Sequence, residues 1–165
     1  MIIIDDFIVD KKILDHFANK EVWERLDESS YNIYSSVHDK IEQPLADFIW
    51  KVKDKFWKYE EWKHFEYWAN ITDEYQQLDW HVDKNEQLTA STGEVVCPLA
   101  GAVWYGYPHK VWGGYLEIEN QHKFNVDYER IQPVYNRIVV FDVSQNHRVA
   151  PILAGRRYGL QVNLW

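Results

Sequence analysis

The sequence has little cysteine and no long hydrophobic run. Its only cysteine, Cys97, has no partner for a disulfide within the chain, so we expect a reducing, intracellular and cytoplasmic setting. Because Cys97 lies in the apolar run 95–99, we expect it to pack as a small hydrophobic side chain and not to act as a nucleophile. No segment approaches the roughly 18 apolar residues of a membrane span. Residues 1–6 also lack the basic region that begins a secretion signal.

Positive charge is scarce as well. Lysine and arginine number 18 against 26 acidic residues, which gives a net charge of −8 and a pI of about 5.3. Proteins that bind nucleic acid usually present a basic patch to the phosphates. The lysine-rich stretch 51–63 is interrupted by Asp54, Glu60 and Glu61, a pattern typical of a solvated helix face. We therefore expect no nucleic-acid partner and no membrane partner.

Aromatic residues, in contrast, are abundant, with nine tryptophans, eleven tyrosines and seven phenylalanines. Aromatic side chains bury a large area each, and 165 residues suffice for one domain with its own core. We predict a single domain over residues 1–165. Residues 1–64 would form a helical support region, and residues 65–165 would form a β core.

Hydrophobic periodicity separates these two regions. Residues 2–9 predict a strand, and helices are expected over 11–18, where Asp10 is the N-cap, and over 43–59. Residues 21–36 predict a short helix or turn followed by a loop. After residue 64 no further long amphipathic helix is evident. Strands are predicted at 65–71, 78–82, 95–105, 114–119, 137–142, 147–151 and 157–164. Short strands at this density predict a β-sandwich or barrel, with the helices covering one sheet.

A metal site is indicated by the pair His81 and Asp83. On a strand, residues i and i+2 point to the same face, so both side chains can reach one ion. The pair alone is also compatible with a packing histidine and a turn aspartate. His147 begins a later strand and is the expected third ligand, which completes the two-histidine, one-carboxylate set of non-haem Fe(II) oxygenases. The remaining histidines lack such context and are expected to be surface or packing residues: His16, His38, His64, His109 and His122.

The segment after His147 supplies a partner for an anion. A turn at residues 154–155 precedes Arg157, so we expect two adjacent antiparallel strands that place Arg157 beside the metal but deeper. A guanidinium binds a carboxylate with two parallel hydrogen bonds, and a five-carbon diacid would reach from the metal to Arg157. Arg156 is the competing choice, because neighbouring residues on a strand point to opposite faces.

Taken in order, these motifs resemble the Fe(II)/2-oxoglutarate-dependent dioxygenases, in the prolyl 4-hydroxylase-like branch. The matching stretches are Ile-Ile-Asp-Asp-Phe-Ile at the start, His81 with Asp83, Val103-Trp-Tyr-Gly, Gly113-Gly-Tyr-Leu, Arg137-Ile-Val-Val-Phe-Asp, and His147 with Arg157-Tyr158. Two places depart from the family pattern. Residues 72–78 contain no tyrosine that can be matched, and Asn163 stands where a tryptophan is common. Both departures concern the substrate side of the pocket.

The resemblance implies a mainly β protein with N-terminal helices, folded as a double-stranded β-helix, a jelly-roll or cupin-like barrel flanked by helices. It implies iron ligation by His81, Asp83 and His147. It further implies Arg157 as the partner of the 2-oxoglutarate C5 carboxylate, Tyr105 as a second hydrogen-bond partner, and Leu116 as a lining residue. Fe(II), 2-oxoglutarate and O2 are the implied cofactor and co-substrates, and ascorbate is a candidate reductant.

The implied function is hydroxylation of a C–H bond, with succinate and CO2 as co-products, on a prolyl residue of a peptide or protein. One alternative is the same chemistry on a free amino acid, another side chain or a small metabolite. An alternative of another class is a β-barrel binding module without turnover. Two loops remain open in role: residues 104–112 could contact substrate or pack as a hairpin, and residues 84–93 could be a lid or a solvent loop. The oligomeric state is left open.

Overall fold

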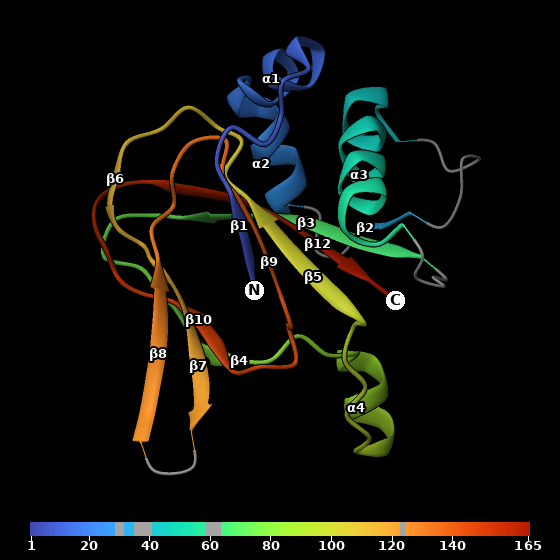
Figure 1. Ribbon diagram of the computed structural model, residues 1–165, viewed down its shortest axis with the longest axis vertical. Coiled ribbons are helices and arrows are strands. Elements are labelled where there is room, and N and C mark those ends of the chain that lie inside the picture. The colour runs from blue at the N-terminus through green and yellow to red at the C-terminus, as the bar shows by residue number, and fades with distance from the viewer. Residues whose placement is uncertain (29–31, 35–40, 59–63, 123–124) are drawn as a thin grey trace.

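A computed structural model describes residues 1–28, 32–34, 41–58, 64–122 and 125–165 of the protein. Two β-sheets lie face to face, and three helices cover the outer side of the larger one (Figure 1). The larger sheet has six strands in the order β1 (Ile2–Ile4), β9 (Ile138–Phe141), β5 (Ala100–Trp104), β12 (Arg157–Leu164), β3 (Phe65–Thr72) and β2 (Asn32–Tyr34). The last strand of the chain is therefore a central strand of the sheet.

The smaller sheet has four strands in the order β4 (Leu78–His81), β10 (His147–Val149), β7 (Leu116–His122) and β8 (Asn125–Ile131). A separate two-stranded sheet pairs β6 (Val111–Gly113) with β11 (Ile152–Gly155). All recorded pairings are antiparallel. This arrangement confirms the prediction of a double-stranded β-helix with N-terminal helices.

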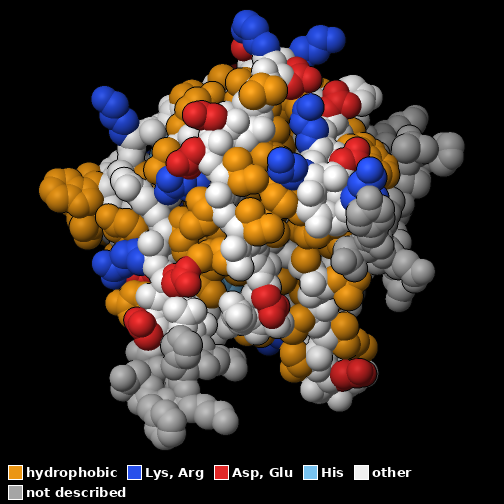
Figure 2. All heavy atoms as spheres, viewed as in Figure 1, with side chains coloured by type: hydrophobic (Ala, Val, Ile, Leu, Met, Phe, Trp, Pro, Cys, Tyr) orange, Lys and Arg blue, Asp and Glu red, His pale blue; other side chains and the backbone are white. Residues whose placement is uncertain are grey.

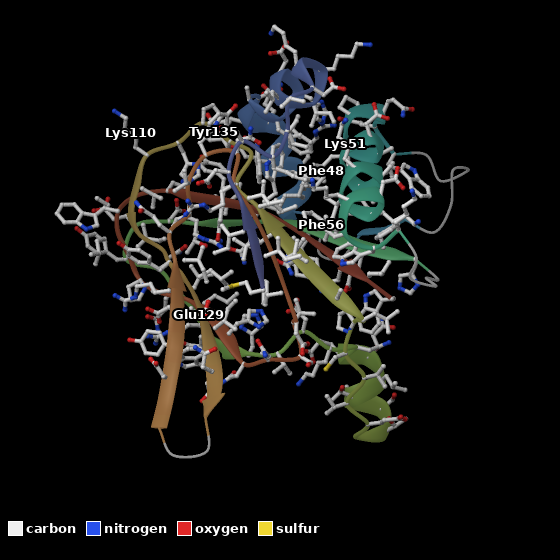
Figure 3. The ribbon with its side chains drawn as sticks, in the orientation of Figure 1. Phe48, Lys51, Phe56, Lys110, Glu129 and Tyr135 are labelled. Atoms are coloured by element: carbon white, nitrogen blue, oxygen red, sulfur yellow. The ribbon has the colours of Figure 1, made fainter. Side chains whose placement is uncertain are left out.

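The helices α1 (Lys11–Phe17), α2 (Lys20–Glu28) and α3 (Gln43–Phe56) bury their apolar faces on the large sheet. Phe48 and Phe56 project from α3 towards the sheet (Figure 3). Phe17 of α1 and Phe48 contact Trp104 of β5, with ring centroids 5.1 and 4.6 Å apart respectively. All three side chains are fully buried, so aromatic packing joins helices and sheet.

A second core lies between the two sheets, and strand β12 contributes to both cores. Its residues Tyr158, Leu160, Val162 and Leu164 pack under the helices. The alternate residues, beginning with Arg157, face the smaller sheet, because side chains on a strand alternate between its two faces. The core between the sheets contains Val103, Tyr105, Leu116, Ile118, Ile131, Val139, Phe141 and Val143.

Several predicted elements are shorter than the sequence indicated. The first strand ends at Ile4, because Asp6 adopts a left-handed conformation with φ of 50° and turns the chain. The strand expected over 95–105 covers only Ala100–Trp104, and Val95 and Leu99 of the apolar run are 58% and 64% exposed. Helix α3 ends at Phe56. Residue 59 of the predicted helix lies outside the described residues, as do residues 29–31 and 35–36 of the segment 21–36.

The structure also contains elements that the sequence analysis did not predict. Residues 84–93 include a short helix, α4 (Glu86–Thr92), which buries none of its side chains. Strands β2, β6 and β11 lie in segments for which the sequence indicates a loop or turn, and β8 lies in a segment for which no element is predicted. The expectation that the strands of His147 and Arg157 are adjacent is wrong: β10 and β12 belong to opposite sheets, with β11 between them in the chain. The two residues therefore face each other across the barrel.

Basic and acidic side chains are interspersed on the face seen in Figure 2, without a continuous basic stripe. Residues 59–63 of the lysine-rich stretch and His38 lie outside the described residues. Within the described ranges, no helix is long and apolar enough to cross a membrane.

Candidate metal and co-substrate site

Three of the predicted site residues converge at one end of the smaller sheet. His81 at the end of β4 pairs directly with His147 at the start of β10, and the ring centroids are 4.3 Å apart. Asp83 follows two residues after His81, and its backbone N–H donates to the Val143 carbonyl at 3.0 Å. The Nε2 atom of each histidine lies 3.7 Å from Asp83 Oδ1. The three ligand atoms all lie within 4.8 Å of one another, close enough to bind one ion.

Backbone carbonyls orient both histidine rings. Nδ1 of His81 lies 2.7 Å from the Asp79 carbonyl, and Nδ1 of His147 lies 2.8 Å from the Gln145 carbonyl. A carbonyl oxygen only accepts a hydrogen bond, so Nδ1 carries the proton in each ring. Nε2 is then left with its lone pair. Burial lowers the pKa of His147, against the opposing effect of Asp83, and this favours the neutral ring that a metal requires.

The second oxygen of Asp83 is held by two side-chain amides from β12. Asn163 Nδ2 donates to Asp83 Oδ2 at 2.9 Å, and Gln161 Nε2 donates to the same oxygen at 3.3 Å. Gln161 Nε2 also donates to Asn163 Oδ1 at 3.0 Å. Oδ2 is thereby occupied, and Oδ1 is left facing the two histidines. Alternation along β12 places Gln161 and Asn163 on the same face as Arg157, but the sequence did not indicate that this amide clamp would meet Asp83.

Arg157 is buried in the same cavity without an acidic partner. It is 2% exposed, and it lines the cavity with His81, Asp83, His147 and Leu116. Its Nη2 donates to the Tyr105 hydroxyl at 3.2 Å, while its Nε has no hydrogen-bond partner. No ion pair of Arg157 is present in the described parts of the chain. A buried guanidinium without a counter-ion is costly, so this cavity is suited to an anion.

Arg156 differs from Arg157 in direction and in partner. Its side chain is 40% exposed and forms an ion pair with Asp73, on the outer side of β12. Gly159 leaves space for Arg157, because a Cβ atom there would stand 3.1 Å from Arg157 Nη1. Arg157 is accordingly the arginine that the fold directs towards His81, Asp83 and His147.

The donor set and the buried cation together fit the group that the sequence indicated. Two imidazole nitrogens and one carboxylate oxygen suit Fe(II) and leave ligand positions open. A diacid that chelates such an ion through one end could place its other carboxylate at Arg157, which forms no ion pair with an acidic side chain of the described residues. Among the described residues, no other group of three histidine, cysteine or acidic side chains is recorded at such close range.

A wider cavity opens on the outer side of His81 and Asp83, with a volume of about 410 Å³. Its walls include Glu66 and Trp68 of β3 and Trp80 of β4, none of which the sequence analysis singled out. Residues 104–112 line neither cavity: Trp104 is buried in the helical core, and Trp112 on β6 is 70% exposed. These two tryptophans therefore do not surround His81, Asp83 and His147. Of this segment, Tyr105 approaches the site, because its hydroxyl accepts a hydrogen bond from Arg157.

Cys97 and the other described histidines lie outside this constellation. The Cys97 thiol is free and half-buried, and burial raises its pKa, so the protonated form is favoured. His16 pairs with Glu42 at 3.1 Å on the helical side. His109 has a buried Nε2 without a partner, and it packs against Tyr158. It is a packing residue, as expected.

Comparisons with known proteins agree with this fold. The model of the 2OG-Fe(II) oxygenase superfamily matches residues 67–165. No curated protein sequence matches the chain significantly.

Solved structures share the fold at low sequence identity. A prolyl-4-hydroxylase from Pseudomonas putida has a TM-score of 0.64 and 14% identity, with 99% of this chain and 83% of that chain covered. A Trichoplax adhaerens prolyl hydroxylase, in complex with a hypoxia inducible factor peptide fragment, has a TM-score of 0.57, 13% identity and coverages of 99% and 82%. HygX from Streptomyces hygroscopicus, with nickel and 2-oxoglutarate bound, has a TM-score of 0.59, 12% identity and coverages of 99% and 80%.

Proposed function

The chain belongs to the 2OG-Fe(II) oxygenase superfamily, and we propose that it hydroxylates a prolyl residue of a peptide or protein. As a 2-oxoglutarate- and Fe(II)-dependent dioxygenase, it consumes 2-oxoglutarate and O2 and releases succinate and CO2. Within this proposal, the helices of residues 1–64 support the large sheet from outside, and residues 65–165 form most of the barrel that carries the site. The expected helical support region also contributes β1 and β2, the two edge strands of the large sheet.

We assign His81, Asp83 and His147 as the iron ligands. The iron supplies the redox chemistry that activates O2, and the protein orients the reactants and shields them from water. Proton positions fixed at Nδ1 of both histidines keep each Nε2 available as a ligand atom. The amide clamp on Asp83 Oδ2 directs Oδ1 towards the histidines.

We assign Arg157 as the partner of the C5 carboxylate of 2-oxoglutarate. The observation that carries the proposal is its burial without a counter-ion in the cavity of the three iron ligands. Tyr105 already accepts a hydrogen bond from Arg157, and its hydroxyl hydrogen can be donated to the same carboxylate. Leu116, which is 3% exposed, provides an apolar wall for the methylene groups of the co-substrate.

The prolyl substrate is supported by the fold shared with prolyl hydroxylases, one of which was solved with a peptide. The same chemistry on a free amino acid, another side chain or a small metabolite is the alternative, because a fold does not determine the substrate. Mass spectrometry of proline-containing peptides distinguishes the two. Gain of one oxygen on proline supports the proposal, and oxygen gained only by non-prolyl substrates overturns it.

Activity itself is tested by succinate release. The protein is supplied with Fe(II), ascorbate and 2-oxoglutarate, with and without candidate peptides. We expect succinate from the wild type and none from His81→Ala, which loses an iron ligand. No succinate under any condition, together with no iron binding, would establish a non-catalytic binding module in place of the enzyme.

The two arginines provide a matched test of the co-substrate site. We expect Arg157→Ala to raise the KM for 2-oxoglutarate by about a hundredfold, because a charge-assisted pair in a buried site is lost. Iron binding should persist in this variant. Arg156→Ala removes the same type of side chain from the outer face and should leave this KM within about twofold. The reverse pattern would mean that the inward and outward faces of β12 are misassigned.

A further inference from the structure

The outer cavity lies beside the iron ligands, where a substrate would approach. Glu66 and Trp68, which line this cavity, both point to the inner face of β3. In the pairing of β3 with β12, Glu66 lies opposite Asn163 and Trp68 lies opposite Gln161. The wall is therefore continuous with the amide clamp that holds Asp83. The volume of the cavity, about 410 Å³, is within the range of ligand-binding sites and is larger than the volume of a single side chain.

Charge in this cavity is unbalanced at one residue. Lys84 Nζ lies 3.8 Å from Glu86 Oε2, so the charges of these two residues offset each other. Glu66 is half-buried, and its Oε2 accepts a hydrogen bond from the neutral indole of Trp165 at 3.0 Å. No lysine or arginine of the described ranges forms an ion pair with Glu66. Burial raises the pKa of the Glu66 carboxyl, and the charge of Asp83 adds to this, so a cation nearby would stabilise its ionised form.

We propose that the outer cavity is a subsite for a cationic group of the substrate, with Glu66 as its counter-ion and Trp68 and Trp80 as its walls. The inference rests on the proposed function, since it places this group beside the C–H bond that is hydroxylated. The group is an ammonium or a guanidinium. It can belong to a lysine or arginine near the target residue of a peptide, or to a free amino acid.

Three features favour a cation over an anion. The half-buried carboxylate of Glu66, which has no cationic partner among the described residues, attracts positive charge. The net charge of −8 also steers cations towards the protein. Indole faces attract cations. The rim already shows this chemistry: the Arg148 guanidinium lies 4.7 Å from the Trp80 ring centroid while it pairs with Glu117. An anionic group would instead be repelled by the carboxylate of Glu66.

The test measures binding without turnover. The protein is loaded with Mn(II), which does not support the redox chemistry, and with 2-oxoglutarate. Capped peptides with a central proline carry lysine, glutamine or glutamate at each flanking position in turn, and their dissociation constants are measured by calorimetry. We expect at least one lysine peptide to bind about tenfold more tightly than its glutamine counterpart, and the glutamate peptide to bind most weakly.

Two variants connect this preference to Glu66. Glu66→Gln should reduce the lysine preference to about twofold or less, because the shape is kept and the charge is lost. Glu86→Gln is the matched control, since it removes the same charge from the same cavity but from a residue already paired with Lys84. It should retain most of the preference. Thermal unfolding verifies that both variants are folded.

Free L-lysine and L-arginine form the second arm. Tighter binding of the free amino acids than of any peptide would assign the cation to a free substrate, and the reverse would assign it to a peptide. The inference is overturned if no cationic probe binds more tightly than its neutral counterpart, or if Glu66→Gln keeps the preference. Succinate release by the Fe(II)-loaded wild type is independent of these outcomes, so failure here would leave the proposed function standing.

Discussion

At the scale of single residues, the two oxygens of one carboxylate have different tasks. Asp83 Oδ1 faces two histidine nitrogens at 3.7 Å each, while Oδ2 is held by amide donors. An aspartate can bind a metal through one oxygen or through both, and the amide clamp selects the first mode. Residues that orient metal ligands in this way commonly influence affinity as strongly as the ligands' own geometry does.

This division of tasks leads to a graded prediction for metal affinity. Asn163→Leu should weaken Mn(II) binding by about tenfold, because Asp83 Oδ2 loses the shorter of its two hydrogen bonds from side-chain amides. Gln161→Leu should have a smaller effect, since its bond is longer, 3.3 Å against 2.9 Å. Electron paramagnetic resonance of Mn(II) titrations measures both constants, and urea unfolding accounts for any loss of fold. Unchanged affinity in Asn163→Leu would contradict the role of the amide clamp.

The clustering of the residues that we assign as iron ligands was predictable because their signal is local. His81 and Asp83 follow the two-residue period of a strand, and His147 and Arg157 occupy a recognisable C-terminal motif. Glu66, Trp68 and Asn163 carried no such signal. Their position depends on which strands pair and in which register, and Glu66 meets Asn163 only because β3 pairs with β12. Long-range pairing of this kind is absent from any local window of the sequence.

At the scale of helices and strands, the elements that the sequence did not predict are ones that bury few side chains. Strand β8 lies at the edge of its sheet and is exposed at residues 127–130, so this stretch lacks the buried apolar face that identifies a strand in a sequence. Helix α4 buries no side chain, so it shows no apolar stripe. Its ends were nevertheless readable. Asn85 accepts a hydrogen bond from the Leu88 backbone N–H at 2.9 Å, and Gly93 closes the helix with φ of 77°.

The N-cap of α4 provides a test at this scale. Asn85→Ala should destabilise the helix by about 1 kcal/mol, which corresponds to about fivefold faster hydrogen exchange in residues 86–92. The thermal midpoint of the whole protein should stay unchanged, because α4 buries nothing. Gln87→Ala, at an exposed position inside the helix, is the control and should leave the exchange unchanged. A fall in the midpoint for Asn85→Ala would show that α4 is coupled to the barrel.

At the scale of the whole molecule, partly buried histidines make stability depend on pH. Burial lowers the pKa values of His16 and His109, with the charge of Arg157 adding to the effect at His109. In the unfolded chain these rings take up protons near their ordinary pKa of about 6.5, whereas the folded protein resists protonation until lower pH. The unfolded state thus binds more protons as the pH falls, and the stability contributed at neutral pH is lost.

We therefore expect the free energy of unfolding of the metal-free protein to decrease between about pH 7.5 and about pH 5.5. His109→Gln has no titrating ring at this position and should show a shallower decrease. Urea unfolding at several pH values measures the slope for each protein. Equal slopes would mean that His109 titrates in the fold as it does in the unfolded chain. Asp5 and Glu42, whose pKa values are lowered by their arginine partners, act in the same direction at more acidic pH.

The order of strands in the large sheet has a consequence for folding. Strand β12 lies between β5 and β3. Before β12 inserts, β2 with β3 and β1 with β9 and β5 form two separate halves with open edges. The same eight residues bring Arg157 and the amides that hold Asp83. Folding intermediates must therefore protect these edges from pairing with other chains, and the insertion of β12 completes the fold and the site together.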